Sequence, residues 1–197
     1  HHDNLHLEWW ALGQKISVKQ GHRGRHHAVH HNTLLVDQED QLKVPCEVSE
    51  FVDEGPVQGA VIRSGDMYPG TAVGRVVMLY DGLIFLFDTF RSKSRHDYDV
   101  VYANAGTAHS ELRFEERGEP LSTEENRYGN PANYALFDEV AVARLDGPAQ
   151  VWWDNLRKSG VRVRMTQVAA GDPGKLFRVR APLVKVDWAN ITGDVEA

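Results

Sequence analysis

Two apolar runs separated by a two-residue turn constrain the fold of this chain more than any other feature. Residues 76–80 (VVMLY) and 83–87 (LIFLF) flank Asp81 and Gly82. An Asp-Gly pair between apolar runs is the strongest short-range signal for a β-hairpin, because both central residues of the tight turn need positive φ angles. The sequence therefore predicts a central antiparallel hairpin.

Apolar and polar residues also alternate with a period of two elsewhere, as in residues 161–166 (VRVRMT). This period is typical of half-buried strands rather than helices. The same alternation predicts a strand that begins at Leu5. Further strands are expected at residues 33–36, 57–63, 98–103, 111–115, 140–145, 150–153 and 176–180. Short strands joined by polar turns predict an all-β fold, a two-layer antiparallel β-sandwich that forms a single domain over residues 1–197.

Two segments between these strands are open to other interpretations. Residues 134–145 could form a short helix instead of a strand, because Leu136, Val140 and Ala143 also lie at helical spacing. Residues 118–132 form the one long polar stretch, and loops of that length are often functional.

Composition excludes several classes of protein. With 42% hydrophobic and 25% charged residues and a mean hydropathy of -0.44, no stretch approaches the roughly 20 apolar residues of a membrane-spanning helix. Five Trp, six Tyr and seven Phe supply enough apolar groups for a packed core. The net charge is -6 and no basic stripe is present, so neither a nucleic acid nor a membrane is expected as a partner.

The single cysteine, Cys46, cannot close an internal disulfide and is expected to be a small buried filler. The adjacent carboxylate of Glu47 would raise a thiol pKa rather than lower it, so a catalytic thiol is not expected here.

Histidines are concentrated at the start of the chain, where eight of the ten lie within the first 31 residues. Imidazole is a common ligand of transition metals and titrates near neutral pH, so the cluster predicts a metal site, an acid-base site or both. Two plainer interpretations stand beside this one. His1 and His2 could remain from a purification tag, and loop histidines such as His22 and His26 could be solvated bystanders.

Three separated segments carry motifs of one known family. Residues 1–13 read HHDNLHLEWWALG, residues 30–37 read HHNTLLVD, and residues 74–90 read GRVVMLYDGLIFLFDTF, followed by HDYD at 96–99. In order and spacing these segments resemble the β domain of the heparinase II/III-like polysaccharide lyases. The second segment is the most specific, because it is similar to the family's His-Asn-Thr signature followed by two hydrophobic residues, Val and Asp.

The resemblance implies a fold and an activity. Members of this family join an N-terminal α/α toroid to a C-terminal β-sandwich and cleave uronic-acid-containing polysaccharides by β-elimination. That reaction needs a neutralised carboxylate, a base at the C5 proton and an acid at the departing O4. In the family a tyrosine and histidines serve as base and acid, and the resemblance makes His31 the catalytic histidine of this chain. The toroid is not in this sequence, so the chain alone is expected to be inactive.

The resemblance also implies a zinc ion held by His1 and His31. The family's third ligand, an Asp two residues before a Gly, is replaced here by Lys19 ahead of Gly21, and an ammonium group cannot bind zinc. Three possibilities follow: the zinc site is lost, one of His26, His27 and His30 completes it, or the charge of Lys19 replaces that of the ion.

The expected partners are an anionic polysaccharide or oligosaccharide and the α/α toroid half of the same enzyme. Arg23, Arg25 and Asn32 are expected to bind substrate, because arginine forks suit carboxylate and sulfate groups, with Asn32 also orienting its loop. A solvated loop is the plainer interpretation of the two arginines. Such an enzyme is expected to be secreted or periplasmic.

The competing hypothesis is a non-catalytic carbohydrate-binding or interaction β-sandwich. The pairs Trp9-Trp10 and Trp152-Trp153 each place one Trp on either face of a strand, and an exposed aromatic face can stack on a sugar ring. The plainer expectation is that one Trp of each pair fills the core while the other packs under a loop. A long helical segment upstream of His1 in the native gene product would favour the lyase, and a natural start near His1 would favour the binding module.

Overall fold

The computed structural model describes residues 2–18, 27–125, 133–155, 160–168, 173–181, 183–184 and 194–195. In these residues the chain is all-β with antiparallel pairing throughout, which confirms the predicted fold class. The helical residues there are two short 3-10 turns, η1 (Ala28–His30) and η2 (Asn133–Leu136). No helix in this part of the chain has the length and apolar character needed to cross a membrane.

The chain divides into two compact units. Unit 1 comprises His1–Leu7 and His26–Tyr102, and unit 2 comprises Glu8–Arg25 and Ala103–Ala197. The expectation of a single domain stays a prediction, and each unit is described by itself.

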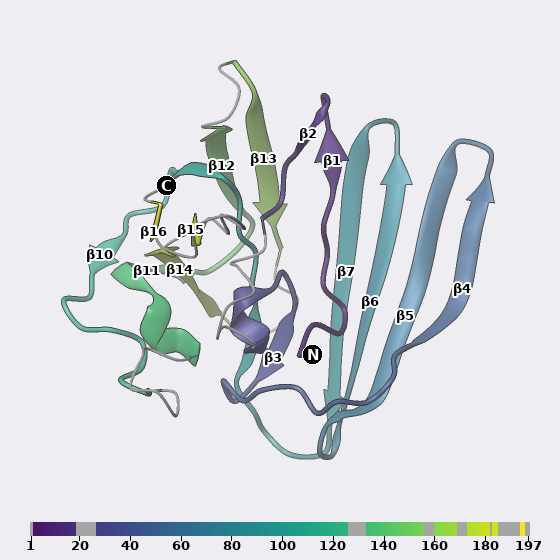
Figure 1. Cartoon of the computed structure of the whole chain (residues 1–197), viewed down its shortest axis with the longest axis horizontal. Helices are drawn as coiled ribbons and strands as arrows, with labels where there is room; N and C mark the ends of the chain where they lie inside the picture. Colours follow the sequence, from purple (N-terminus) through teal and green to yellow (C-terminus); the bar gives the residue numbers. More distant parts are fainter. Residues whose placement is uncertain are drawn as a thin grey trace. The chain divides into compact units, whose positions relative to one another are not determined.

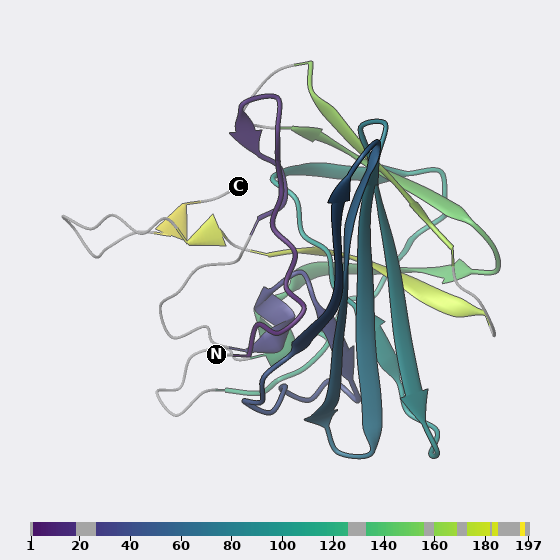
Figure 2. The same cartoon turned by 90° about the vertical axis from the view of Figure 1, so that its right-hand side faces the viewer.

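A four-stranded antiparallel sheet dominates unit 1 (Figure 1). Its strands are β4 (Glu47–Glu54), β5 (Val57–Tyr68), β6 (Thr71–Tyr80) and β7 (Leu83–Ser92), in that spatial order. Tyr80 pairs with Leu83 across the last turn, in which Asp81 and Gly82 have φ angles of 49° and 74°. Two positive φ angles define a type I′ turn, so the predicted hairpin is confirmed. Figure 2 shows these long strands from a second side.

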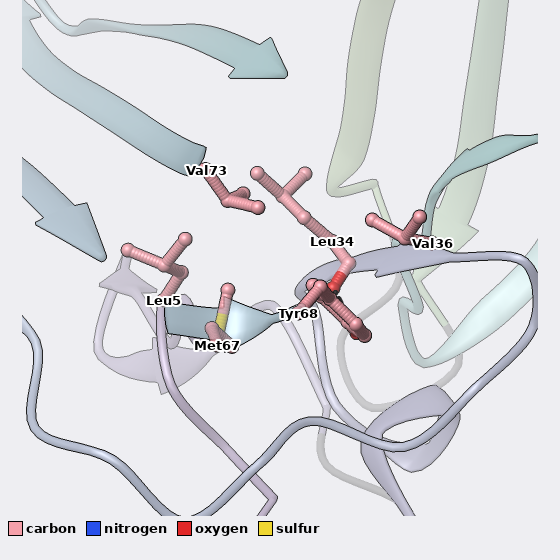
Figure 3. Packing of buried hydrophobic residues seen from close by; sticks show 6 residues of the cluster. All are labelled: Leu5, Leu34, Val36, Met67, Tyr68 and Val73. Carbon is pink, nitrogen blue, oxygen red and sulfur yellow. Dashed lines mark hydrogen bonds between the residues drawn. The ribbon is translucent and has the colours of Figure 1, made fainter. Parts of the chain in front are cut away.

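A short second layer packs against one face of this sheet. It consists of β3 (Leu34–Val36) paired with β8 (Tyr98–Val100). Their side chains share a core with residues of the sheet and of the N-terminal segment: Leu5, Leu34, Val36, Met67, Tyr68 and Val73 (Figure 3). The Tyr68 hydroxyl donates a hydrogen bond of 3.0 Å to the Leu34 carbonyl, which satisfies its polar group inside this core.

The described part of unit 2 contains two three-stranded sheets and two short hairpins. One sheet has the order β13 (Arg162–Gln167), β12 (Ala149–Asn155), β9 (Gly106–Ser110). The other has the order β10 (Glu115–Glu116), β11 (Asp138–Leu145), β14 (Gly174–Arg180). The hairpins are β1 (Trp10–Ala11) with β2 (Gln14–Lys15), and β15 (Leu183–Val184) with β16 (Asp194–Val195).

Most of the expected strands are present, but some predictions are wrong. Leu5 does not begin a strand, because its φ angle is 62° and the His6 amide donates to the Asp3 carbonyl in a turn. Of the expected strand at residues 111–115, only Glu115 is in a strand, the two-residue β10. Strand β9 ends at Ser110, and the Ser110 hydroxyl accepts a hydrogen bond from the Leu112 amide. Strands β4 and β9 and the short strands β2, β15 and β16 were not expected.

The structure answers part of the question about the two segments whose interpretation the sequence left open. Residues 134–145 contain the strand β11, and only the short turn η2 precedes it, so the helical alternative is wrong. Of the polar loop, residues 126–132 lie outside the described residues. Cys46 is half-buried against the core of unit 1, close to its expected role as a filler.

Candidate functional site

His31 lies where the 3-10 turn η1 gives way to strand β3. Its backbone is extended, and its amide donates to the Ala28 carbonyl to close the turn. The side chain is 3% exposed. Its ring packs edge-on against the ring of His6, with the centroids 5.1 Å apart. The structure therefore places this imidazole inside unit 1 rather than on its surface.

Asn32 joins the N-terminal segment to the start of β3. Its backbone amide donates to Nδ1 of His6 at 3.0 Å, and its side-chain amide donates to the Leu7 carbonyl at 3.0 Å. The Leu7 amide in turn donates to the Asn32 carbonyl. Because Nδ1 of His6 accepts a hydrogen bond, that nitrogen carries no proton. Asn32 is fully buried, and its visible role is to orient this loop.

Arg75 is the residue that ties the site together, and sequence reasoning did not single it out. Its guanidinium is 3% exposed and binds Asp88 with Nε and Nη2. Its Nη1 donates to the Leu5 carbonyl at 2.6 Å and to the Asn32 carbonyl at 2.8 Å. A buried cation is tolerated when it is paired and hydrogen-bonded in this way. One side chain thus contacts all three segments that carry the family resemblance.

A buried amide completes this network. Gln41 is fully buried, and its Nε2 lies within hydrogen-bonding distance of the Asn4 carbonyl (3.1 Å) and the Thr33 hydroxyl (3.0 Å). Its Oε1 accepts the Asn4 amide at 2.9 Å. The segment before Leu5 is therefore held by the side chain of Gln41.

The other histidines of this region have structural partners. Nδ1 of His27 lies 2.5 Å from one carboxylate oxygen of Asp40, and the other oxygen accepts a hydrogen bond from the Ala28 amide at the start of η1. The His27 ring lies edge-on to His30, which is buried.

Several expected site residues lie outside the described part of the chain. These are His1, Lys19, Arg23, Arg25 and His26. Within the described residues, no group of three or more His, Cys, Asp or Glu side chains could hold a metal ion. Of the two expected zinc ligands only His31 is described, so the zinc site stays a prediction.

Two other ionisable groups, the Tyr68 hydroxyl and the Cys46 thiol, are held in their neutral forms. Burial raises the pKa of the Tyr68 hydroxyl, and the carboxylate of Asp40 adds to this effect. Burial also raises the pKa of the Cys46 thiol. Neither group is poised as a base or a nucleophile near neutral pH.

Known proteins were compared with this chain by sequence and by structure. No protein-family model and no curated protein matches the sequence. Among solved structures, the chain is similar to heparinase III, with 14% sequence identity and a TM-score of 0.43. The alignment covers 84% of this chain and 27% of the heparinase III chain. The chain thus spans about a quarter of the length of that protein.

Proposed function

We propose that this chain is the β domain of a polysaccharide lyase that cleaves a uronic-acid-containing polysaccharide by β-elimination when joined to an α/α toroid. The observation that supports the proposal most is the position of Arg75. It joins Leu5, Asn32 and Asp88, and these residues come from the three sequence segments that resemble the lyase family. The segments therefore form one hydrogen-bonded unit instead of three independent matches.

The proposed chemistry divides the work between two halves. The toroid supplies the base for the C5 proton and most of the substrate cleft, and the β domain supplies the remaining wall of that cleft. A substrate of this kind lies outside the cytoplasm, so the proposal includes a secreted or periplasmic location, which fractionation of the native host would test.

His31 has one of two roles in this proposal. As a catalytic residue it would exchange a proton with the polymer, whereas as a positioning residue it would hold the segment from η1 to β3 through its contact with His6. The 3% exposure of His31 supports the positioning role. The His31→Ala variant separates the two roles: loss of a positioning residue lowers kcat and leaves the pH profile in place, and loss of a proton-transfer group removes one limb of that profile.

The direct test uses the native full-length protein with alginate, heparin, heparan sulfate, chondroitin sulfate and hyaluronan. A lyase produces an unsaturated uronate, which is followed by its ultraviolet absorbance. We expect product from at least one polymer and none from the isolated 197-residue chain. No product from any uronate polymer, with binding retained, would contradict the proposal and favour a non-catalytic carbohydrate-binding module.

A matched control separates the role of His31 from the effect of an arbitrary surface substitution. Arg144 lies in unit 2 with its side chain 75% exposed. The Arg144→Gln variant should keep the kcat of the full-length enzyme within about twofold, since substitutions of exposed side chains usually have small effects.

A further inference from the structure

The outer face of the β9, β12 and β13 sheet carries an aromatic side chain among charged and polar ones. Trp152 stands at its centre, directly between His109 on β9 and Arg164 on β13 in the strand register. Thr107, Asp154 and Arg162 form the next row, and Gln150 and Thr166 the row on the other side. These side chains share one face, because opposite residues of antiparallel strands point the same way.

The two faces of this sheet have opposite character. Val151, Trp153 and Val163 are buried on the inner face. Trp152 is half-buried on the outer face, and its neighbours Arg162 and Arg164 are exposed. The expectation that one Trp of this pair fills the core is therefore confirmed for Trp153, while Trp152 lies among charged side chains.

An ion-paired frame holds the aromatic groups in place. Asp154 binds the Nε of Arg162 at 2.8 Å and lies 3.2 Å from the Nε2 of His109. The His109 ring is nearly parallel to that of Trp152, with 19° between the planes and 5.9 Å between the centroids. The hydrogen bond from Arg162 lowers the pKa of Asp154, with a smaller contribution from His109. The frame therefore presents an ordered aromatic pair to solvent.

Arg164 is a cation on the same face that does not take part in this frame of ion pairs. Asp154 is engaged by Arg162 and His109, and among the described residues no ion pair engages the Arg164 guanidinium. The face thus carries one uncompensated positive charge beside an indole, in a chain whose net charge is -6. An arginine fork matches a carboxylate, and an aromatic ring matches the apolar face of a pyranose.

We infer that the outer face of β9, β12 and β13 binds an acidic saccharide, with the sugar ring against Trp152 and its carboxylate on Arg164. The hydroxyls of Thr107 and Thr166 and the amide of Gln150 provide partners for sugar hydroxyls on the same face. A nucleic acid fits less well, because its binding needs a row of cations along the backbone. The inference goes beyond the proposed lyase activity, since it concerns binding by unit 2 and no bond cleavage.

Binding by the whole protein to polygalacturonate oligosaccharides, measured by calorimetry, tests the inference. The Arg164→Gln variant should weaken the affinity about tenfold, and Trp152→Ala at least as much, because each removes one of the two main contacts. The Trp152→Phe variant keeps an aromatic ring in the sheet and should retain part of the affinity. If the Trp152→Ala variant does not fold, Trp152→Phe still tests the contact between the aromatic ring and the sugar.

The matched control is Arg144→Gln, which removes an exposed arginine from the other sheet of unit 2. It should bind as the unmodified protein does, and neutral dextran should not bind to any of these proteins. Equal affinity of the unmodified and Arg164→Gln proteins would overturn the inference. So would an equal loss in the Arg144→Gln protein, equal binding of dextran, or equal binding of single-stranded DNA. Lyase activity is measured separately, so its absence leaves this result unaffected.

Discussion

The guanidinium of Arg75 faces the carboxylate of Asp88 across the pairing of β6 with β7, with Nε to Oδ1 at 2.7 Å and Nη2 to Oδ2 at 3.0 Å. Both side chains are largely buried. Such a pair is stable only as a unit, because either charge alone would be left buried without its counter-charge.

The Arg75→Gln variant should therefore lose about 3 to 5 kcal/mol of unfolding free energy, as expected for breaking a buried ion pair. It also removes the donor to the Leu5 and Asn32 carbonyls. Urea denaturation followed by circular dichroism measures the change. The control is Arg144→Gln, whose ion pair with Asp146 is on the surface, and it should stay within about 0.5 kcal/mol of the unmodified protein. Equal stabilities of the two variants would contradict this prediction.

Loss of the Tyr68 hydroxyl should lower the free energy of unfolding by a smaller amount, independently of Arg75. The Tyr68→Phe variant removes the hydrogen bond to the Leu34 carbonyl and should cost about 1 kcal/mol. Tyr98→Phe is a suitable control, because Tyr98 is 40% exposed and lies on the neighbouring strand β8. The same denaturation experiment measures both, and a larger loss for Tyr98→Phe would be the opposite of the expected result.

Acid should weaken the end of the β3 and β8 ladder through Asp37. Its carboxylate accepts hydrogen bonds from Nδ1 of His96 at 2.6 Å and from the Asp97 amide at 2.9 Å. Both bonds lower the pKa of Asp37 from 3.8, and the bond from His96 has the larger effect. Because the native pKa is below that of the unfolded chain, the stabilisation is present at higher pH and is lost as the pH falls through the native value. The melting temperature of the unmodified protein should therefore exceed that of Asp37→Asn at pH 6, by a margin that narrows on acidification below about pH 4. The prediction would be wrong if the difference in melting temperature between the two proteins did not change with pH. In that case the hydrogen bond from His96 would not lower the pKa of Asp37.

Cys46 should react slowly in the native state. Burial raises its thiol pKa, so less thiolate is present than in the unfolded chain. Iodoacetamide at pH 8 should modify the native protein several-fold more slowly than the urea-unfolded protein. Since Cys46 is the single cysteine, the mass of the intact protein reports the reaction directly. Equal rates in the two states would mean that the thiol is not protected.

Local signals in the sequence predicted the parts of the fold that depend on neighbouring residues. The Asp81-Gly82 turn and the alternation around Trp152 involve residues a few positions apart, and both predictions are confirmed. Strand β4 escaped notice because charged residues make up half of it and all eight of its side chains are exposed. An edge strand of this kind lacks the apolar pattern that marks a strand with a buried face.

The candidate site depends on contacts that no local pattern contains. Arg75 binds partners 13, 43 and 70 positions away in the sequence. The alternation at Leu5 looked like a strand, but its apolar residues are fixed by a core and by hydrogen bonds to distant segments. The resemblance drew attention to His31 and Asn32, yet it gave no indication that both side chains would be buried.

Strand β4 also has a consequence for how the protein behaves at high concentration. It is an edge of its sheet, it carries apolar side chains such as Phe51, and it is interrupted by a bulge after Val48. Its four carboxylates, from Glu47, Glu50, Asp53 and Glu54, would repel a second copy that tried to extend the sheet in the same place. The protein should therefore remain dispersed at neutral pH and low salt. In strong acid the carboxylates are uncharged, and the edge becomes an unprotected template for the addition of a strand from another copy. Light scattering should then detect aggregates of the unmodified protein. The Phe51→Lys variant should form fewer of them, because it places a positive charge on the same edge.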